Sequence, residues 1–270
     1  MCRLILASGT FDPADIVAAA VQMSRGLTAD HDNATTVHAH GWGAVWRDPG
    51  SGALRAHRDE RPAAESAPDS PVATARTDFL AIHVRNATLP ENRGPAFTHP
   101  LERPGDPWYF MHNGYLPTAY RGLGLAASAF DSAEYFDYLI PPGTERLDER
   151  TALARLRALE PGGTSGNAVA VHPDRAHLVH WSPPDTRTPR FFAMRRTTTA
   201  TAQIVASETV PALAPPAAWR PVAPGTVLTF PFTAPTTERT PTCPSSGAAS
   251  STTSTSPASP LRTVPASSRA

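Results

Sequence analysis

The order of the helical and strand-like patterns is the feature that most constrains the fold. A helix is expected near the start, where Asp12 and Pro13 provide an N-cap and a first helical residue before an apolar stripe. Strand-like segments follow, then helical patterns at residues 131–140 and 148–159, and then further strand-like segments. Because helices and strands come in blocks rather than in alternation, the order favours layers built on antiparallel sheets over an alternating parallel fold.

The strand-like segments are short apolar runs bounded by turn residues. Residues 41–47 and 53–57 are expected to form a hairpin, and the polar residues 61–76 a loop or a short helix. Further strands are expected, in chain order, at residues 79–84, 108–111, 167–172, 177–181, 191–195 and 203–207.

The last part of the chain differs in composition from the rest. Of the 38 residues from 233 to 270, 30 are Thr, Ser, Pro or Ala, and the bulky aliphatics are Leu261 and Val264. Such a segment cannot bury enough apolar surface to offset its conformational entropy. We therefore expect one folded domain at residues 2–232 and a disordered tail at residues 233–270.

Charge and cysteine content exclude several classes of protein. The 24 basic and 24 acidic residues leave no net charge, which argues against a dedicated nucleic-acid binder. No apolar run approaches the roughly 18 to 20 residues of a membrane span, and the first hydrophobic stretch is too short for a signal peptide. With only Cys2 and Cys243, no disulfide framework or paired-cysteine metal site is expected. These features predict a cytoplasmic protein with neither a membrane nor a nucleic acid as partner.

Cys2 is the first candidate for chemistry, because removal of Met1 would place it at the amino terminus. A terminal cysteine has a thiol with an ordinary pKa of about 8.5 and an α-amine with one of about 8. The amine can therefore take the thiol proton, as in other nucleophile–amine pairs. The alternative is a small buried cysteine that opens a strand, since free cysteine is among the most buried residue types.

Three further polar groups follow predicted strands or begin a predicted helix. Arg85, where residues 79–84 end, can hold a carboxylate with two hydrogen bonds, and Thr88 can add a hydroxyl; the alternative is an arginine that reaches solvent at the rim. Asn113 and Gly114 can donate to a developing oxyanion or form an ordinary Asn-Gly turn. Asp131 can bind an ammonium group, act as an N-cap, or do both.

Taken in order, five motifs resemble those of the class II glutamine amidotransferases. They are Met1-Cys2-Arg3-Leu4, His40-Gly41-Trp42-Gly43, His83-Val84-Arg85-Asn86-Ala87-Thr88, Phe110-Met111-His112-Asn113-Gly114 and Asp131-Ser132. The similarity covers about residues 2–230 and is greatest to a stand-alone bacterial group that includes γ-glutamyl hydrolases. It implies an α+β fold, the four-layer αββα sandwich of two stacked antiparallel sheets found in N-terminal nucleophile hydrolases.

The resemblance also implies a role for each candidate residue. Cys2 would attack the side-chain amide of glutamine, and its own amine would be the general base and would then protonate ammonia. Water would cleave the resulting γ-glutamyl thioester without a metal or an organic cofactor. The remaining roles are an oxyanion hole of Asn113 and Gly114, a carboxylate clamp at Arg85, an ammonium site at Asp131, a pocket wall of Trp42 and Gly43, and support of the substrate site by Thr88.

Two departures from the family pattern leave alternatives open. Ala133 stands where many relatives have glutamate, and no acceptor domain is expected before the tail. The activity could therefore be that of an amidohydrolase acting on glutamine or a related γ-glutamyl compound, or of an ammonia-supplying subunit for a separate partner synthase. A different class of function is a non-catalytic γ-glutamyl-binding module. Six other histidines are expected to be surface or core residues: His31, His38, His99, His172, His177 and His180.

Overall fold

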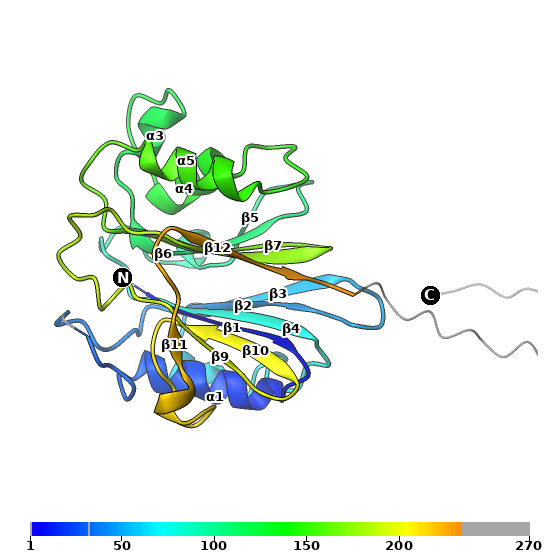
Figure 1. Cartoon of the computed structure of the whole chain (residues 1–270). Helices are drawn as coiled ribbons and strands as arrows, with labels where there is room; N and C mark the ends of the chain where they lie inside the picture. Colours follow the sequence, from blue (N-terminus) through cyan, green and yellow to red (C-terminus); the bar gives the residue numbers. More distant parts are fainter. Residues whose placement is uncertain (1, 32, 234–270) are drawn as a thin grey trace, which may run out of the picture. The chain divides into compact units, whose positions relative to one another are not determined.

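The chain forms four layers in the order helices, sheet, sheet, helices, as predicted (Figure 1). The computed structural model describes residues 2–31 and 33–233. Apart from Thr233, the predicted tail therefore lies outside the described residues. Within the described part, no helix is long and apolar enough to cross a membrane.

Two antiparallel sheets form the inner layers. Sheet A has seven strands in the order β11 (Arg220–Pro221), β9 (Arg195–Thr198), β10 (Ala202–Ala206), β1 (Arg3–Gly9), β4 (Phe79–Val84), β2 (Trp42–Arg47) and β3 (Leu54–Asp59). Sheet B has five strands in the order β12 (Thr226–Pro231), β8 (Arg175–His180), β7 (Ser165–His172), β6 (Tyr109–Tyr115) and β5 (Leu101–Glu102).

Helices cover the outer faces of the two sheets (Figure 1). Helices α1 (Pro13–Ser24) and α2 (Ala63–Ser66) pack on sheet A. Helices α3 (Ala119–Gly122), α4 (Asp131–Leu139) and α5 (Glu149–Arg157) pack on sheet B. Two 3-10 turns lie at Pro95–Phe97 and Pro216–Ala218.

Strand alternation explains why apolar residues fill three core layers. On β1, Leu4 and Leu6 point toward sheet B, whereas Ile5 and Ala7 point toward α1. Successive side chains of a strand point to opposite faces, so a strand buried on both faces reads as a continuous apolar run. This is why β1 shows no polar alternation in the sequence.

Helices α1 and α5 have side-chain caps at their first turns. The Asp12 carboxylate accepts a hydrogen bond from the Ala14 backbone N–H at 2.9 Å, and Pro13 is the first residue of α1. The Asp148 carboxylate accepts from the Thr151 N–H at 2.8 Å at the start of α5. Each cap satisfies a backbone donor that the helix itself leaves unpaired.

Most predicted elements are present, including the helix that begins at Asp131, but one predicted strand is misplaced and two of the alternatives considered for polar residues do not occur. Residues 191–194 form turns rather than a strand, and β9 begins only at Arg195, where pairing with β10 starts. Asn113 and Gly114 continue β6 instead of forming a turn, because they pair with Asn167 and Gly166 of β7. Asp131 is not an N-cap: Phe130 holds that position, and Asp131 is the first residue of α4.

Candidate active site

Cys2 lines a narrow pocket where β1 of sheet A meets β6 of sheet B. The pocket has about 30 Å³ of free volume, far below the roughly 300 Å³ or more of ordinary ligand pockets. Of the predicted site residues, Cys2, Arg85, Thr88, Gly114 and Asp131 line it. Asn113 lies directly behind it and contacts Cys2. The fold therefore brings six of the eight predicted residues together.

The backbone of Cys2 is held from both sides. Its N–H donates to the Asn113 side-chain oxygen at 2.9 Å, and its carbonyl oxygen accepts from Arg3 Nη1 at 3.1 Å. The side chain is buried, with 8% of its surface exposed, and Sγ lies 3.9 Å from the Asn86 carbonyl oxygen. The thiol is thus fixed at the base of the pocket.

A buried ion pair holds the start of β1 in this position. Arg3 Nε donates to Glu208 Oε1 at 2.6 Å, and the Arg3 guanidinium stacks on the Phe191 ring at 3.7 Å. Glu208 also accepts from the Thr28 hydroxyl at 2.5 Å. Glu208 follows β10, the strand next to β1, so its position beside Arg3 follows from the pairing of these two strands.

Asn113 and Gly114 are well arranged to meet negative charge. The Asn113 side-chain oxygen is used by Cys2, while its Nδ2 is buried and has no hydrogen-bond partner in the described structure. A buried amide donor without a partner costs free energy, which a substrate oxygen would recover. At Gly114 a Cβ atom would lie 1.8 Å from the Ser165 carbonyl oxygen, so only glycine fits.

Arg85 presents one free edge of its guanidinium to the pocket. Nε donates to the Phe97 carbonyl oxygen at 2.8 Å and Nη2 to that of Asn92 at 2.5 Å. Nη1 is buried without a partner. The side chain is 4% exposed, so its charge lies in a poorly solvated site where a carboxylate would bind favourably.

Asp131 reaches the pocket from the first turn of α4. Its Oδ2 accepts from the Leu116 N–H at 2.9 Å and lies 3.9 Å from His112 Nδ1. His112 is held by Ser132 Oγ at 2.9 Å and the Ser165 carbonyl oxygen at 3.0 Å, and burial, more than any other cause, lowers its pKa. Asp131 is therefore the carboxylate available to a bound ammonium group.

The environment favours the thiolate form of Cys2. Burial raises the pKa of the Cys2 thiol, but the charges of His83 and Arg85 act in the opposite direction. Their combined effect holds the pKa well below its ordinary value. A thiolate is the reactive form of cysteine, and this environment differs from that of an inert core thiol, whose pKa burial alone would raise.

Trp42 does not shape the pocket wall, which corrects the prediction. Its indole is fully buried on the α1 side of sheet A and donates to Ser66 Oγ at 2.8 Å. Gly43 faces the other way, opposite His83, and a Cβ there would lie 2.1 Å from the His99 carbonyl oxygen. The missing Cβ atom of Gly43 therefore leaves room for the backbone of His99, which lines the pocket.

Sequence reasoning missed three histidines near Cys2 and its pocket. His99 and His112 line the pocket, and the ring centroids of His83 and His99 are 4.3 Å apart. His99 was expected among unrelated surface or core residues, because it lies in a segment without a periodic pattern. His83 and His112 belong to the motifs given above. The alternation of side chains along the strands that carry Arg85 and Asn113 could have indicated that these histidines lie near the pocket.

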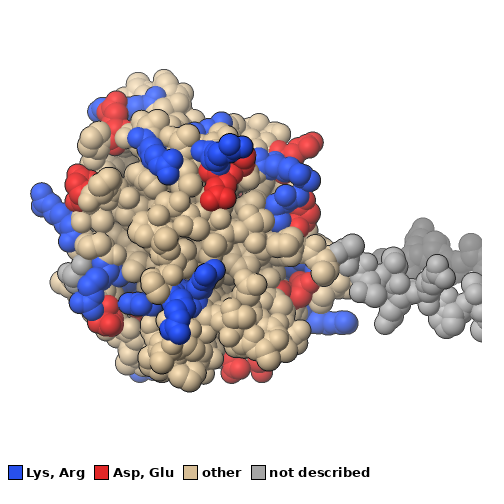
Figure 2. Space-filling model, in the orientation of Figure 1, with Lys and Arg blue, Asp and Glu red and all other residues tan. Residues whose placement is uncertain are grey.

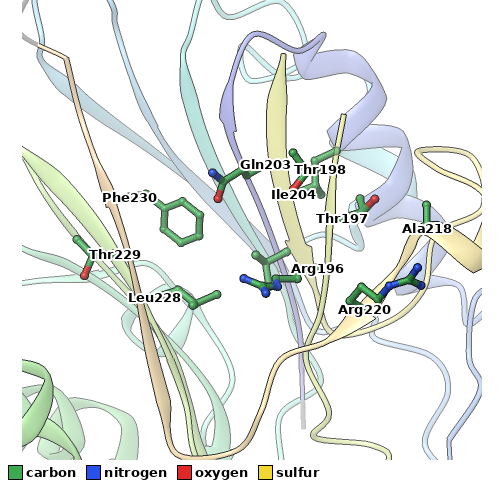
Figure 3. Close-up of a pocket in the computed structure, with 11 residues that line it drawn as sticks. Arg196, Thr197, Thr198, Gln203, Ile204, Ala218, Arg220, Leu228, Thr229 and Phe230 are labelled. Atoms are coloured by element: carbon green, nitrogen blue, oxygen red, sulfur yellow. The ribbon is translucent and has the colours of Figure 1, made fainter. Parts of the chain in front are cut away.

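A larger cavity lies elsewhere, between the open edges of the two sheets (Figure 3). Its volume is about 470 Å³, and its lining includes Arg196, Gln203, Arg220 and Phe230. It is lined by no cysteine, histidine or carboxylate, so it offers no nucleophile or base of the kind found at Cys2. On the face shown in Figure 2, arginines and acidic residues lie among one another without a continuous basic stripe.

The family comparison agrees with the motifs. The sequence model of the class II glutamine amidotransferases matches residues 1–130, which contain the motifs from Cys2 to Gly114. This match confirms the resemblance that the motifs suggested. No curated protein matches the chain.

Solved structures share the fold of this chain over most of its length. A glutamine phosphoribosylpyrophosphate amidotransferase from B. subtilis matches with a TM-score of 0.56 and 17% identity, covering 86% of this chain and 49% of its own. An allosteric regulatory enzyme of purine biosynthesis matches with a TM-score of 0.61 and 20% identity, covering 85% of this chain and 47% of its own. A class II glutamine aminotransferase domain protein from Silicibacter pomeroyi matches with a TM-score of 0.54 and 20% identity, covering 84% of this chain and 94% of its own. The chain thus spans about half the length of the first two.

Proposed function

We propose that this protein is a cysteine-dependent amidohydrolase that cleaves the side-chain amide of glutamine or of a related γ-glutamyl compound. The observation that carries the proposal is the contact between Cys2 and Asn113. One end of the Asn113 amide holds the backbone nitrogen of the nucleophile, and the other end is a buried donor without a partner. That arrangement suits a reaction in which Cys2 attacks a carbonyl and the carbonyl oxygen becomes negative.

The charged groups of the pocket account for an amino-acid substrate. Arg85 Nη1 would hold the α-carboxylate, and the Asp131 carboxylate would hold the α-ammonium group. Together they would select substrates with a free γ-glutamyl head group over simple amides. Because the free volume is small, the lining of the pocket would have to open when substrate binds.

The reaction would proceed through a γ-glutamyl thioester. After removal of Met1, the nitrogen of Cys2 is an α-amine beside the thiol, and it can pass a proton to the departing ammonia. Sγ forms the thioester bond as the C–N bond breaks, and Asn113 Nδ2 with the Gly114 N–H would stabilise the oxyanion. Water then cleaves the thioester to give the free carboxylate and Cys2.

The direct test is release of ammonia by purified mature protein from glutamine and a panel of γ-glutamyl compounds. We expect turnover with at least one compound and none by Cys2→Ser, because an alcohol stays protonated where a thiol ionises. Cys2→Ser changes one atom, so unchanged thermal unfolding would show that the loss is chemical. Turnover by Cys2→Ser at the wild-type rate would contradict the assignment. Binding without turnover by the wild type would favour a non-catalytic γ-glutamyl-binding module.

A further inference from the structure

His83 lies on the same face of sheet A as the Cys2 thiol. Leu4 pairs directly with His83, and Arg3 pairs with Val84, so Cys2 falls opposite Arg85. Cys2 and His83 are therefore diagonal neighbours on adjacent antiparallel strands. Such neighbours have Cα atoms roughly 7–8 Å apart, within reach of an imidazole ring.

The tautomer of His83 is set by sheet B. His83 Nε2 lies 3.0 Å from the His112 carbonyl oxygen, and a carbonyl can only accept, so Nε2 carries a hydrogen. In a neutral imidazole the other nitrogen, Nδ1, is then an acceptor. Nδ1 is fully buried, without a hydrogen-bond partner of ordinary geometry in the described structure. The Cys2 thiol, on the diagonal neighbour of His83, is a proton donor on the same face of sheet A.

We propose that His83 takes the thiol proton of Cys2 in the resting enzyme, so that the nucleophile is stored as a thiolate beside an imidazolium. The S–H bond breaks, an N–H bond forms at Nδ1, and the number of protons is unchanged. The two N–H groups of the imidazolium then point to Sγ and to the His112 carbonyl oxygen. The α-amine of Cys2 is left to protonate the departing ammonia. The inference deepens the proposed function. It depends on that function only where it concerns turnover, because the ionisation of Cys2 can be measured without substrate.

The other charged and titratable groups around His83 are compatible with this ion pair. His99 packs against the ring, and burial, with the charges of His83 and Arg85, holds its pKa well below the ordinary value, so it stays neutral. On β6, burial lowers the pKa of His112 as well. Arg85 on β4 adds positive charge that favours the thiolate. Asp131 on α4 interacts with His112 and Leu116 rather than with His83.

His83→Gln separates the proton acceptor from the structural contact. A glutamine amide nitrogen can replace Nε2 as donor to the His112 carbonyl, but glutamine has no basic group at the position of Nδ1. The readout is the rate of Cys2 alkylation by iodoacetamide between pH 5 and pH 10, followed by peptide mass so that Cys243 is scored separately. His177→Gln, another buried histidine that lies on β8, is the matched control.

We expect the wild-type rate to reach half its maximum well below pH 8.5, the ordinary value for a thiol. In His83→Gln the midpoint should rise by one pH unit or more, with alkylation at least tenfold slower at pH 6. In His177→Gln the midpoint should stay in place. An unchanged midpoint in His83→Gln would overturn the proposal. A merely structural role of His83 would alter stability without moving the midpoint.

A second measurement covers the case in which His83→Gln fails to fold. Nitrogen chemical shifts of labelled histidines report the charge of His83 in the wild type and in Cys2→Ala. We expect an imidazolium at pH 7 in the wild type and a neutral ring in Cys2→Ala, and a neutral ring in the wild type would overturn the proposal. Neither measurement uses substrate. A His83-dependent midpoint in a protein that hydrolyses no γ-glutamyl compound would therefore refute the proposed function alone.

Discussion

Asn113 uses its two polar ends for different purposes, and this predicts a kinetic signature. Its oxygen holds Cys2, and its Nδ2 would meet an oxyanion that exists only after attack. Asn113→Ala should therefore lower kcat by about 100-fold or more and change KM little. Steady-state kinetics with the best substrate of the panel measures both constants.

Arg85→Ala should show the opposite split. The α-carboxylate that Arg85 would bind carries the same charge in the ground and transition states. Its loss is a loss of uniform binding, which raises KM far more than it lowers kcat. A fall in kcat without a rise in KM would place Arg85 in the chemical step instead.

At the scale of residues, sequence order predicted the pocket better than it predicted individual orientations. Cys2, Arg85, Asn113 and Asp131 come together as the motifs suggested. The prediction that Trp42 forms part of the pocket wall was wrong because adjacent residues of a strand face opposite sides of the sheet. Which side faces the pocket depends on how the strand pairs with β4. Such pairing is a long-range property that a short motif does not contain.

At the scale of elements, the Arg3–Glu208 ion pair joins the start of β1 to the residues that follow β10. Both side chains are buried, at 0% and 5% exposure. Glu208→Gln would leave the Arg3 charge without a counter-charge, which typically costs about 3–5 kcal/mol. We expect a loss of that order in the free energy of unfolding, measured with urea.

Glu102→Gln is the matched control for this prediction. Glu102 forms an ion pair with Arg58, but the two side chains are 45% and 34% exposed. Exposed pairs contribute about 0–1 kcal/mol, so its unfolding free energy should change little. Equal losses in the two variants would show that the buried pair has no special role.

The same scale shows where local patterns fail to set element boundaries. Asn-Gly is a typical turn dipeptide, but β6 runs through Asn113 and Gly114. A residue with a Cβ atom at position 114 would clash with Ser165 on β7, so only glycine allows this close approach. Phe191 looks like a strand residue but packs on the Arg3 guanidinium from a turn. In both cases a tertiary contact overrides the local preference.

At the scale of the whole molecule, buried histidines predict loss of stability in acid. Burial, as the largest cause, lowers the pKa of His177 and of His180 to about 4. In the unfolded chain a histidine titrates near pH 6.5, so between about pH 6.5 and pH 4 the unfolded state binds more protons. The unfolding free energy should therefore fall as pH falls through this window, by up to about 3 kcal/mol for each histidine.

Urea unfolding at pH 7 and pH 4.5 checks this prediction. His177→Gln removes one of the two groups, so its stability should depend less steeply on pH than that of the wild type. The same slope in both proteins would contradict the role given to His177.

The boundary of the folded domain is also testable. The Thr233 carbonyl oxygen accepts from Arg47 Nη2 at 2.5 Å, so a truncated chain should keep Thr233. The sequence beyond it has few core-forming residues. A chain that ends at Ala234 should keep the thermal stability and activity of the full chain, and a large loss of either would contradict this boundary.

The nucleophile assignment is tested most directly by intact mass and peptide mapping of the purified protein. The protein is incubated with a glutamine analogue that carries an electrophilic carbon in place of the amide carbon. We predict a chain that begins at Cys2, gains one equivalent of label at Cys2 and is protected by excess substrate. Active protein that retains Met1, or label that never reaches Cys2, would contradict the account.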